Sequence, residues 1–216
     1  RNDNGPLGRP PPLSFSRAER MGERSVPVPE PNLKSIASAW ASLGSARVIQ
    51  YSWTIWRADV PKDSLLGRAR VAIEKALHLD SLSAAAWSAD GMYACWAEDF
   101  GRARKSLERA IRLDSLEANA WFTLGVLYGA DRLNEYQLAE RALRRAISLD
   151  PALQNRWRHL AMVMERSGRL VEAEALLDTA LALGDWAPAV SARARIRFYR
   201  GNSAGALEDL RWEERL

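Results

Sequence analysis

The stretch from Ala118 to Pro151 decides the fold. It reads ANAWFTLGVLY over residues 118–128 and, after a short polar break, LAERALRRAISLDP over residues 138–151. Apolar residues recur in both segments at the three- and four-residue spacing of an amphipathic helix. The stretch therefore predicts two helices joined by a turn.

A second observation extends this pattern along the chain. The segment GRARVAIEKALHLDS at 67–81 recurs without gaps as GRARKSLERAIRLDS at 101–115, which is 34 residues later. Chance rarely repeats small and large residues over fifteen positions. A period of this length is typical of stacked structural repeats.

The central stretch resembles a tetratricopeptide repeat, whose first helix carries the pattern W-x-x-L-G-x-x-Y. Here that pattern is filled by Trp121, Leu124, Gly125 and Tyr128, and Ala139 begins the small-large-small pattern of the second helix. The resemblance implies an all-α, TPR-type solenoid of antiparallel helix pairs, with about five repeats of which the last is partial. We expect the repeats at about 37–83, 84–117, 118–153, 154–186 and 187–216.

The register of the first and last repeats follows less directly from the pattern. In the first repeat we prefer Trp40 over Trp53 as the signature tryptophan, and we expect either a long first helix or an extra loop around residues 57–64. In the last repeat the first helix, VSARARIRFYR at 190–200, alternates apolar and basic residues and is also compatible with a strand. A lone strand after four helix pairs would have no pairing partner, so we predict a helix.

The signature residues have a structural role in this pattern. Small residues let the helix backbones approach closely, and large residues fill the gaps between neighbouring pairs. Each buried tryptophan would remove about 200 Å² from water and join one repeat to the next. The residues assigned to this role are Trp40, Gly44, Trp87, Gly91, Trp121, Leu124, Gly125, Tyr128, Ala139, Trp157, Leu160 and Ala173.

Residues 1–32 differ from the rest of the chain. They hold most of the prolines, including Pro10-Pro11-Pro12, and proline cannot propagate a helix. We predict a disordered linker here, with a proline-motif ligand as the alternative, and a solenoid over 33–216. Because the chain opens on Arg1 rather than methionine, we expect it to be part of a longer polypeptide.

Composition and motifs indicate no catalytic chemistry. Hydrophobic residues make up 47% and charged residues 27% of the 216 residues, no 18-residue apolar run predicts a membrane span, and the net charge is only +4. The single cysteine, Cys95, favours a reducing, cytoplasmic setting and a buried, unreactive thiol. We find no catalytic motif and predict no catalytic residue, metal or cofactor. His78 is expected on the surface, and a lone His159 is a poor metal site.

The resemblance implies that the first helix of each repeat lines a concave groove. This groove is expected to be apolar and aromatic in the middle and basic toward its C-terminal end, which suits a peptide or a partner helix. The alternative is that the linker or a neighbouring domain covers it. The carboxylate clamp of chaperone-binding relatives is missing. The predicted partner-binding residues are Ser88, Met92, Trp96, Asn119, Phe122, Thr123, Val126, Asn155, Arg158, His159, Met162 and Arg166. Cys95 and Glu165 fall on the same face.

We therefore predict a protein–protein interaction module that acts as a scaffold for a protein or peptide ligand. The sequence pattern of the repeats also resembles that of repeat arrays in bacterial multidomain regulators. The alternative is accordingly a regulatory C-terminal part of a signalling kinase, cyclase or transcriptional regulator whose catalytic or DNA-binding domain lies upstream. Nucleic-acid binding through the cluster from Arg193 to Arg200 is a minor alternative, disfavoured by the acidic Glu208 and Asp209 nearby.

Overall fold

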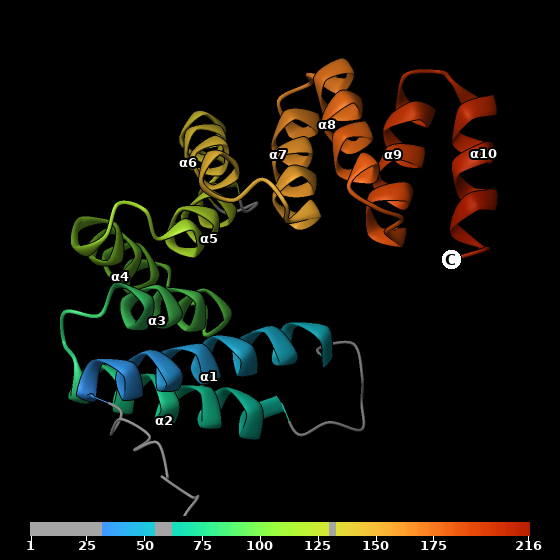
Figure 1. Ribbon diagram of the computed structural model, residues 1–216. Helices are drawn as coiled ribbons and strands as arrows, with labels where there is room; N and C mark the ends of the chain where they lie inside the picture. Colours follow the sequence, from blue (N-terminus) through green and yellow to red (C-terminus); the bar gives the residue numbers. More distant parts are fainter. Residues whose placement is uncertain (1–31, 55–61, 130–132) are drawn as a thin grey trace, which may run out of the picture. The chain divides into compact units, whose positions relative to one another are not determined.

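The computed structural model describes residues 32–54, 62–129 and 133–216, and these form ten α-helices and no strand (Figure 1). The proline-rich segment, apart from Asn32, and most of the region of the predicted extra loop lie outside the described residues. The helices are α1 (Leu33–Thr54), α2 (Lys62–Leu79), α3 (Ala84–Trp96), α4 (Phe100–Leu113), α5 (Ala118–Gly129), α6 (Tyr136–Leu149), α7 (Gln154–Arg166), α8 (Leu170–Ala182), α9 (Ala187–Tyr199) and α10 (Ser203–Glu213).

Each odd-numbered helix packs most extensively on the helix that follows it, which gives five pairs. We call α1, α3, α5, α7 and α9 the first helices and their partners the second helices. The first helix of each pair also contacts the first helix of the next pair, whereas no second helix contacts another second helix within the described residues. This is the all-α, five-pair solenoid that the repeat pattern predicts. The alternating segment 190–200 lies in α9 rather than in a strand, apart from the turn at Arg200.

Small residues allow the two helices of a pair to approach closely. A Cβ added to Gly125 would lie 2.6 Å from Leu143 Cγ, and one added to Gly44 would lie 2.6 Å from Ile73 Cγ1. Gly91 is equally crowded by Leu107. The recurrence of this contact at Gly44 favours Trp40 as the signature tryptophan of the first pair.

The first three turns between pairs are each held by the same two hydrogen bonds. The indole Nε1 of Trp87, Trp121 and Trp157 donates to the carbonyl oxygen six residues earlier, at 2.9, 3.0 and 2.9 Å. The aspartate that opens each turn, as Asp114 does, accepts from the amide two residues later. These tryptophans are half-buried rather than fully buried. The partial exposure arises because each indole reaches a turn at the surface.

Several helices begin at a residue whose side chain caps the first turn. The Asn32 side chain accepts from the Ser35 amide at 2.8 Å, as expected of an N-cap, and Ser83, Asp99 and Asn202 cap α3, α4 and α10 in the same way. Among the described residues no helix is both long and apolar enough to cross a membrane.

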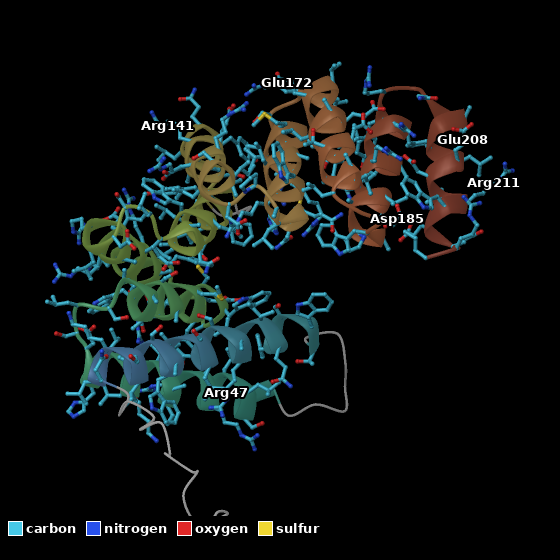
Figure 2. The ribbon with its side chains drawn as sticks, in the orientation of Figure 1. Arg47, Arg141, Glu172, Asp185, Glu208 and Arg211 are labelled. Atoms are coloured by element: carbon cyan, nitrogen blue, oxygen red, sulfur yellow. The ribbon has the colours of Figure 1, made fainter. Side chains whose placement is uncertain are left out.

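Charged side chains lie on the outer parts of the second helices. Arg141 projects from α6 away from α5, and Glu208 and Arg211 project from α10 away from α9 (Figure 2). All three are exposed. They offer positions for control substitutions that leave the first helices untouched.

Candidate functional site

The contacts among the first helices create one continuous layer, and we call the side-chain surface of this layer the first-helix surface. The predicted partner-binding residues all lie on three of its helices, α3, α5 and α7. Met92, Phe122, Val126 and Met162 are half-buried there, so each keeps part of an apolar side chain exposed.

Two predicted residues do not reach this surface. Ser88 is 3% exposed and Thr123 is 5% exposed, and the Thr123 hydroxyl is buried without a hydrogen-bond partner. Both positions fall among the buried residues of their own helices. Assigning Ser88 and Thr123 to a partner-binding surface was therefore wrong for the described structure.

Two further predicted residues hold the helices together. Arg166 Nη1 donates to the carbonyl oxygen of Gly129 at 2.5 Å, at the C-terminal end of α5. Asn119 accepts at 3.2 Å from Arg156, whose guanidinium also donates to the Asp150 carbonyl oxygen and pairs with the Asp150 carboxylate, both at 2.8 Å. Arg156 is 3% exposed. Arg156 thereby joins the start of α5 to the end of α6, and the Asn119 side chain is used for this internal contact.

The central part of the surface is a row of aromatic and basic side chains. Phe122 on α5 meets His159 on α7 edge to face, with ring centroids 5.2 Å apart and planes at 82°. The guanidinium of Arg158 lies 3.2 Å from the sulfur of Met162 and 3.3 Å from His159 Nε2. It also lies 5.7 Å from the ring centroid of Trp186, the residue that precedes α9. We call Phe122, Arg158, His159, Met162 and Trp186 the α7 cluster.

The electrostatics of the α7 cluster are unusual. Burial, with the nearby Arg158 and Arg166, lowers the pKa of His159 from 6.5 to about 3, so the ring is neutral at pH 7. A neutral imidazole can accept a hydrogen bond through one ring nitrogen, as the contact with Arg158 requires. Burial also lowers the pKa of Arg158, and the positive charge of Arg195 lowers it further.

The basic residues of α9 form ion pairs. Arg195 donates to both carboxylate oxygens of Glu165 on α7 at 2.8 Å. Arg193 binds Asp209 through two nitrogens, at 2.6 and 3.1 Å, and Arg197 also reaches that carboxylate at 3.1 Å. Asp209 is 2% exposed.

The remaining arginine of this predicted cluster is paired too. Arg197 binds Glu174 on α8 at 2.9 Å, and Arg200 pairs with the same carboxylate. The predicted run of four arginines is therefore an internal ion-pair network that crosses from α7 to α10. It does not present the unpaired positive stripe that phosphate binding requires, so the nucleic-acid alternative loses its basis.

The N-terminal part of the surface is aromatic. Trp96 is 37% exposed and meets Tyr51 on α1 edge to face at 5.6 Å. Cys95 is half-buried, and burial raises the pKa of its thiol to about 12. Its thiolate is therefore scarce at neutral pH, as the prediction of an unreactive thiol requires.

No group of three metal-ligating side chains occurs in the residues that the structure describes. A surface hollow of about 600 Å³ lies against α1 and α2, and its lining includes Trp40, Lys75 and His78. Lys75 Nζ stands 4.5 Å above the Trp40 ring, which gives that tryptophan an internal partner. His78 is exposed, as predicted.

The repeat pattern did not predict the roles of three residues that shape this region. Arg156 and Asp209 are buried charges at positions where the repeat motif specifies nothing. Trp186 stands outside the W-x-x-L-G register, and only its place directly before α9, after Gly184 and Asp185, could have drawn attention to it.

Comparisons with known proteins agree with the helix-pair architecture. Residues 118–153 match the family model described as tetratricopeptide repeat. A search of curated proteins finds no significant match. Several solved structures share the fold at low sequence identity.

Three of these structures illustrate the likeness. YrrB, described as a TPR protein with an unusual peptide-binding site, is 24% identical, with a TM-score of 0.55 over 77% of this chain and 82% of that one. A thermophilic TPR protein of Thermus thermophilus is 18% identical, with a TM-score of 0.62 over 78% and 87%. PilF of Pseudomonas aeruginosa is 18% identical, with a TM-score of 0.60 over 79% and 75%. At these identities the likeness shows the fold alone.

Proposed function

We propose that this tetratricopeptide-type solenoid binds a peptide or a partner helix on its first-helix surface, with α5 and α7 at the centre of the contact. The fold class is that of a protein-interaction scaffold. Beyond the fold class, we assign the place where the partner lies and the kind of segment that it presents. A cytoplasmic setting belongs to the same proposal, in keeping with the single Cys95.

The observation that carries the proposal is the row of half-buried apolar side chains on consecutive first helices. Phe122 and Val126 lie one turn apart on α5, and Met162 lies on α7, which packs against it. Apolar and aromatic groups that are partly exposed on one surface favour a ligand that covers them. Their spacing along and across two helices suits an extended segment or a helix face.

The structural relatives support the same function at the level of the fold. YrrB is described as having a peptide-binding site and shares this architecture at 24% identity. We carry over only the idea that a peptide is a suitable ligand for such a scaffold. Of the predicted residues, Met92, Trp96, Phe122, Val126, Asn155, Arg158, His159 and Met162 remain in the proposed contact surface.

A matched pair of variants tests the proposal. A random peptide library displayed on phage is selected against the chain, and the recovered peptides are measured by fluorescence anisotropy. Val126→Lys places a charged side chain on the first-helix surface, whereas Val171→Lys makes the same change on α8, where Val171 is 65% exposed. We expect Val126→Lys to weaken binding by about tenfold or more and Val171→Lys to leave it within about twofold. Equal affinities for the two variants would show that the peptides bind elsewhere.

A further inference from the structure

We propose that Arg158 is the anchor for an aspartate or glutamate side chain of the partner segment, and that an apolar residue beside it packs against the rings of the α7 cluster. This inference rests on the proposed function and specifies the chemistry of the ligand. It makes the partner an acidic peptide segment rather than a generally apolar one.

Arg158 carries a positive charge among uncharged groups. The side chain is half-buried, and its Nε atom is buried without a hydrogen-bond partner. Its guanidinium contacts a thioether sulfur, a neutral imidazole and an indole face, none of which carries negative charge. A cation withdrawn from water gains from a carboxylate that arrives with a ligand, because the ligand supplies the missing counter-charge.

The carboxylate of Glu165, on the same helix as Arg158, is already paired within this chain. Glu165 stands about two turns further along α7, and both of its oxygens bind Arg195 at 2.8 Å. The charged group that most affects Arg158 is Arg195, which is another cation. On α9, in contrast, Arg193, Arg195 and Arg197 each bind a carboxylate of this chain. The structure thus satisfies the α9 arginines internally and leaves Arg158 for a group from outside.

The rings around Arg158 indicate what accompanies the acidic group. The indole of Trp186 lies near the guanidinium, and His159, which also contacts it, meets the ring of Phe122. Aromatic rings beside a cation suit a segment that pairs one acidic side chain with an apolar or aromatic one. Because α7 packs against both α5 and α9, the first-helix surface extends on both sides of Arg158. We therefore assign the carboxylate to a side chain rather than to a chain terminus.

The test compares each peptide recovered from the random library with a matched analogue, called here its amide twin. In the twin the acidic residue is replaced by its amide, Glu by Gln or Asp by Asn. We expect recovered peptides to be enriched in acidic residues beside apolar ones. The amide twin should bind the unmodified chain about tenfold more weakly than its acidic parent does, whereas Arg158→Gln should bind the two within about twofold of each other.

Two control variants keep the result interpretable. Arg158→Lys retains the charge and should keep most of the preference for the acidic peptide, and Arg141→Gln removes an exposed arginine from α6 and should keep all of it (Figure 2). A circular-dichroism melt for each variant reports whether the fold is intact. If Arg158→Gln unfolds, the comparison of the acid and amide peptides on Arg158→Lys decides the matter, since a loss of preference there overturns the inference.

The outcomes separate the two proposals. Two outcomes overturn the acidic anchor and leave the proposed function standing. In the first, the peptides bind the first-helix surface but lack acidic residues. In the second, replacing the acid by its amide weakens binding to Arg158→Gln as much as it weakens binding to the unmodified chain. Peptides that carry an acidic residue at their free C-terminus, and lose binding when only that terminus is amidated, overturn the assignment to a side chain. A selection that recovers no binding peptide overturns both.

Discussion

Replacing Gly125 with alanine places a methyl group in the closest contact between α5 and α6. The added Cβ would lie 2.6 Å from Leu143 Cγ, 3.0 Å from Leu143 Cδ2 and 3.1 Å from the Leu143 backbone nitrogen. Carbon atoms in contact are ordinarily about 3.5–4.0 Å apart. Because one of the crowded atoms belongs to the backbone of α6, a rotamer change of Leu143 alone cannot relieve the contact.

Two effects of opposite sign decide the stability of this variant. Alanine favours a helix interior over glycine by about 1 kcal/mol. Overpacking a close contact costs about 1–3 kcal/mol. A matched substitution isolates the second effect: Gly67 lies in α2, and a Cβ there would meet nothing within 4 Å. Gly67→Ala should therefore stabilise the chain by about 0.5–1 kcal/mol, while Gly125→Ala should be neutral to destabilising by about 2 kcal/mol.

Urea unfolding followed by circular dichroism measures both variants against the unmodified chain. The difference between the two free energies of unfolding gives the cost of the contact and should be about 1–3 kcal/mol. If Gly125→Ala stabilises as much as Gly67→Ala, then the helices do not pack through Gly125 and the repeat register is wrong.

Three further predictions address the turns, the ion pairs and the pH response. Trp121→Phe should cost about 1 kcal/mol, because it removes the indole N–H that binds the preceding turn but keeps most of the ring, whereas Trp121→Ala should cost about 2–3 kcal/mol for a half-buried indole. Urea unfolding of both variants measures the two costs, and a Trp121→Phe variant as stable as the unmodified chain would contradict the hydrogen bond. Asp209→Asn should cost about 3 kcal/mol or more in urea unfolding, because Arg193 and Arg197 lose the buried charge that they share; a loss below about 1 kcal/mol would contradict the network. Folding lowers the pKa of His159 from 6.5 to about 3. Between these two pH values the unfolded chain binds a proton that the folded chain does not. The free energy of unfolding should therefore fall by up to about 1.4 kcal/mol per pH unit as the pH drops below 6.5. His159→Gln should lose this component when urea midpoints at about pH 7.5 and pH 5 are compared, and an unchanged pH dependence would contradict it.

The repeat motif predicted the fold because its positions describe contacts within one helix pair. Gly125 and Leu143 meet across α5 and α6, and the same spacing places Gly44 against Ile73. Such contacts depend only on the local geometry of two helices and a turn, which a period of about 34 residues encodes directly. The helical state of 190–199 was predicted on a different ground, since a lone strand after four helix pairs would have no pairing partner.

The candidate site was less predictable because it depends on contacts between pairs. Thr123 is 5% exposed, and the motif leaves its position free and therefore does not specify its burial. The pairing of Arg195 with Glu165 joins residues 30 positions apart on different helix pairs. A charge count over α9 therefore suggested a basic patch where the structure has an ion-pair network.

Photo-crosslinking reports directly where the partner lies on the solenoid. The chain is prepared with p-benzoylphenylalanine in place of Met162 on α7 or, as the control, in place of Arg141 on α6, and each form is irradiated with a library-selected peptide. We expect a crosslinked product at position 162 and none above background at position 141. A product at position 141 with none at position 162 would contradict the assignment of the first-helix surface as the binding surface.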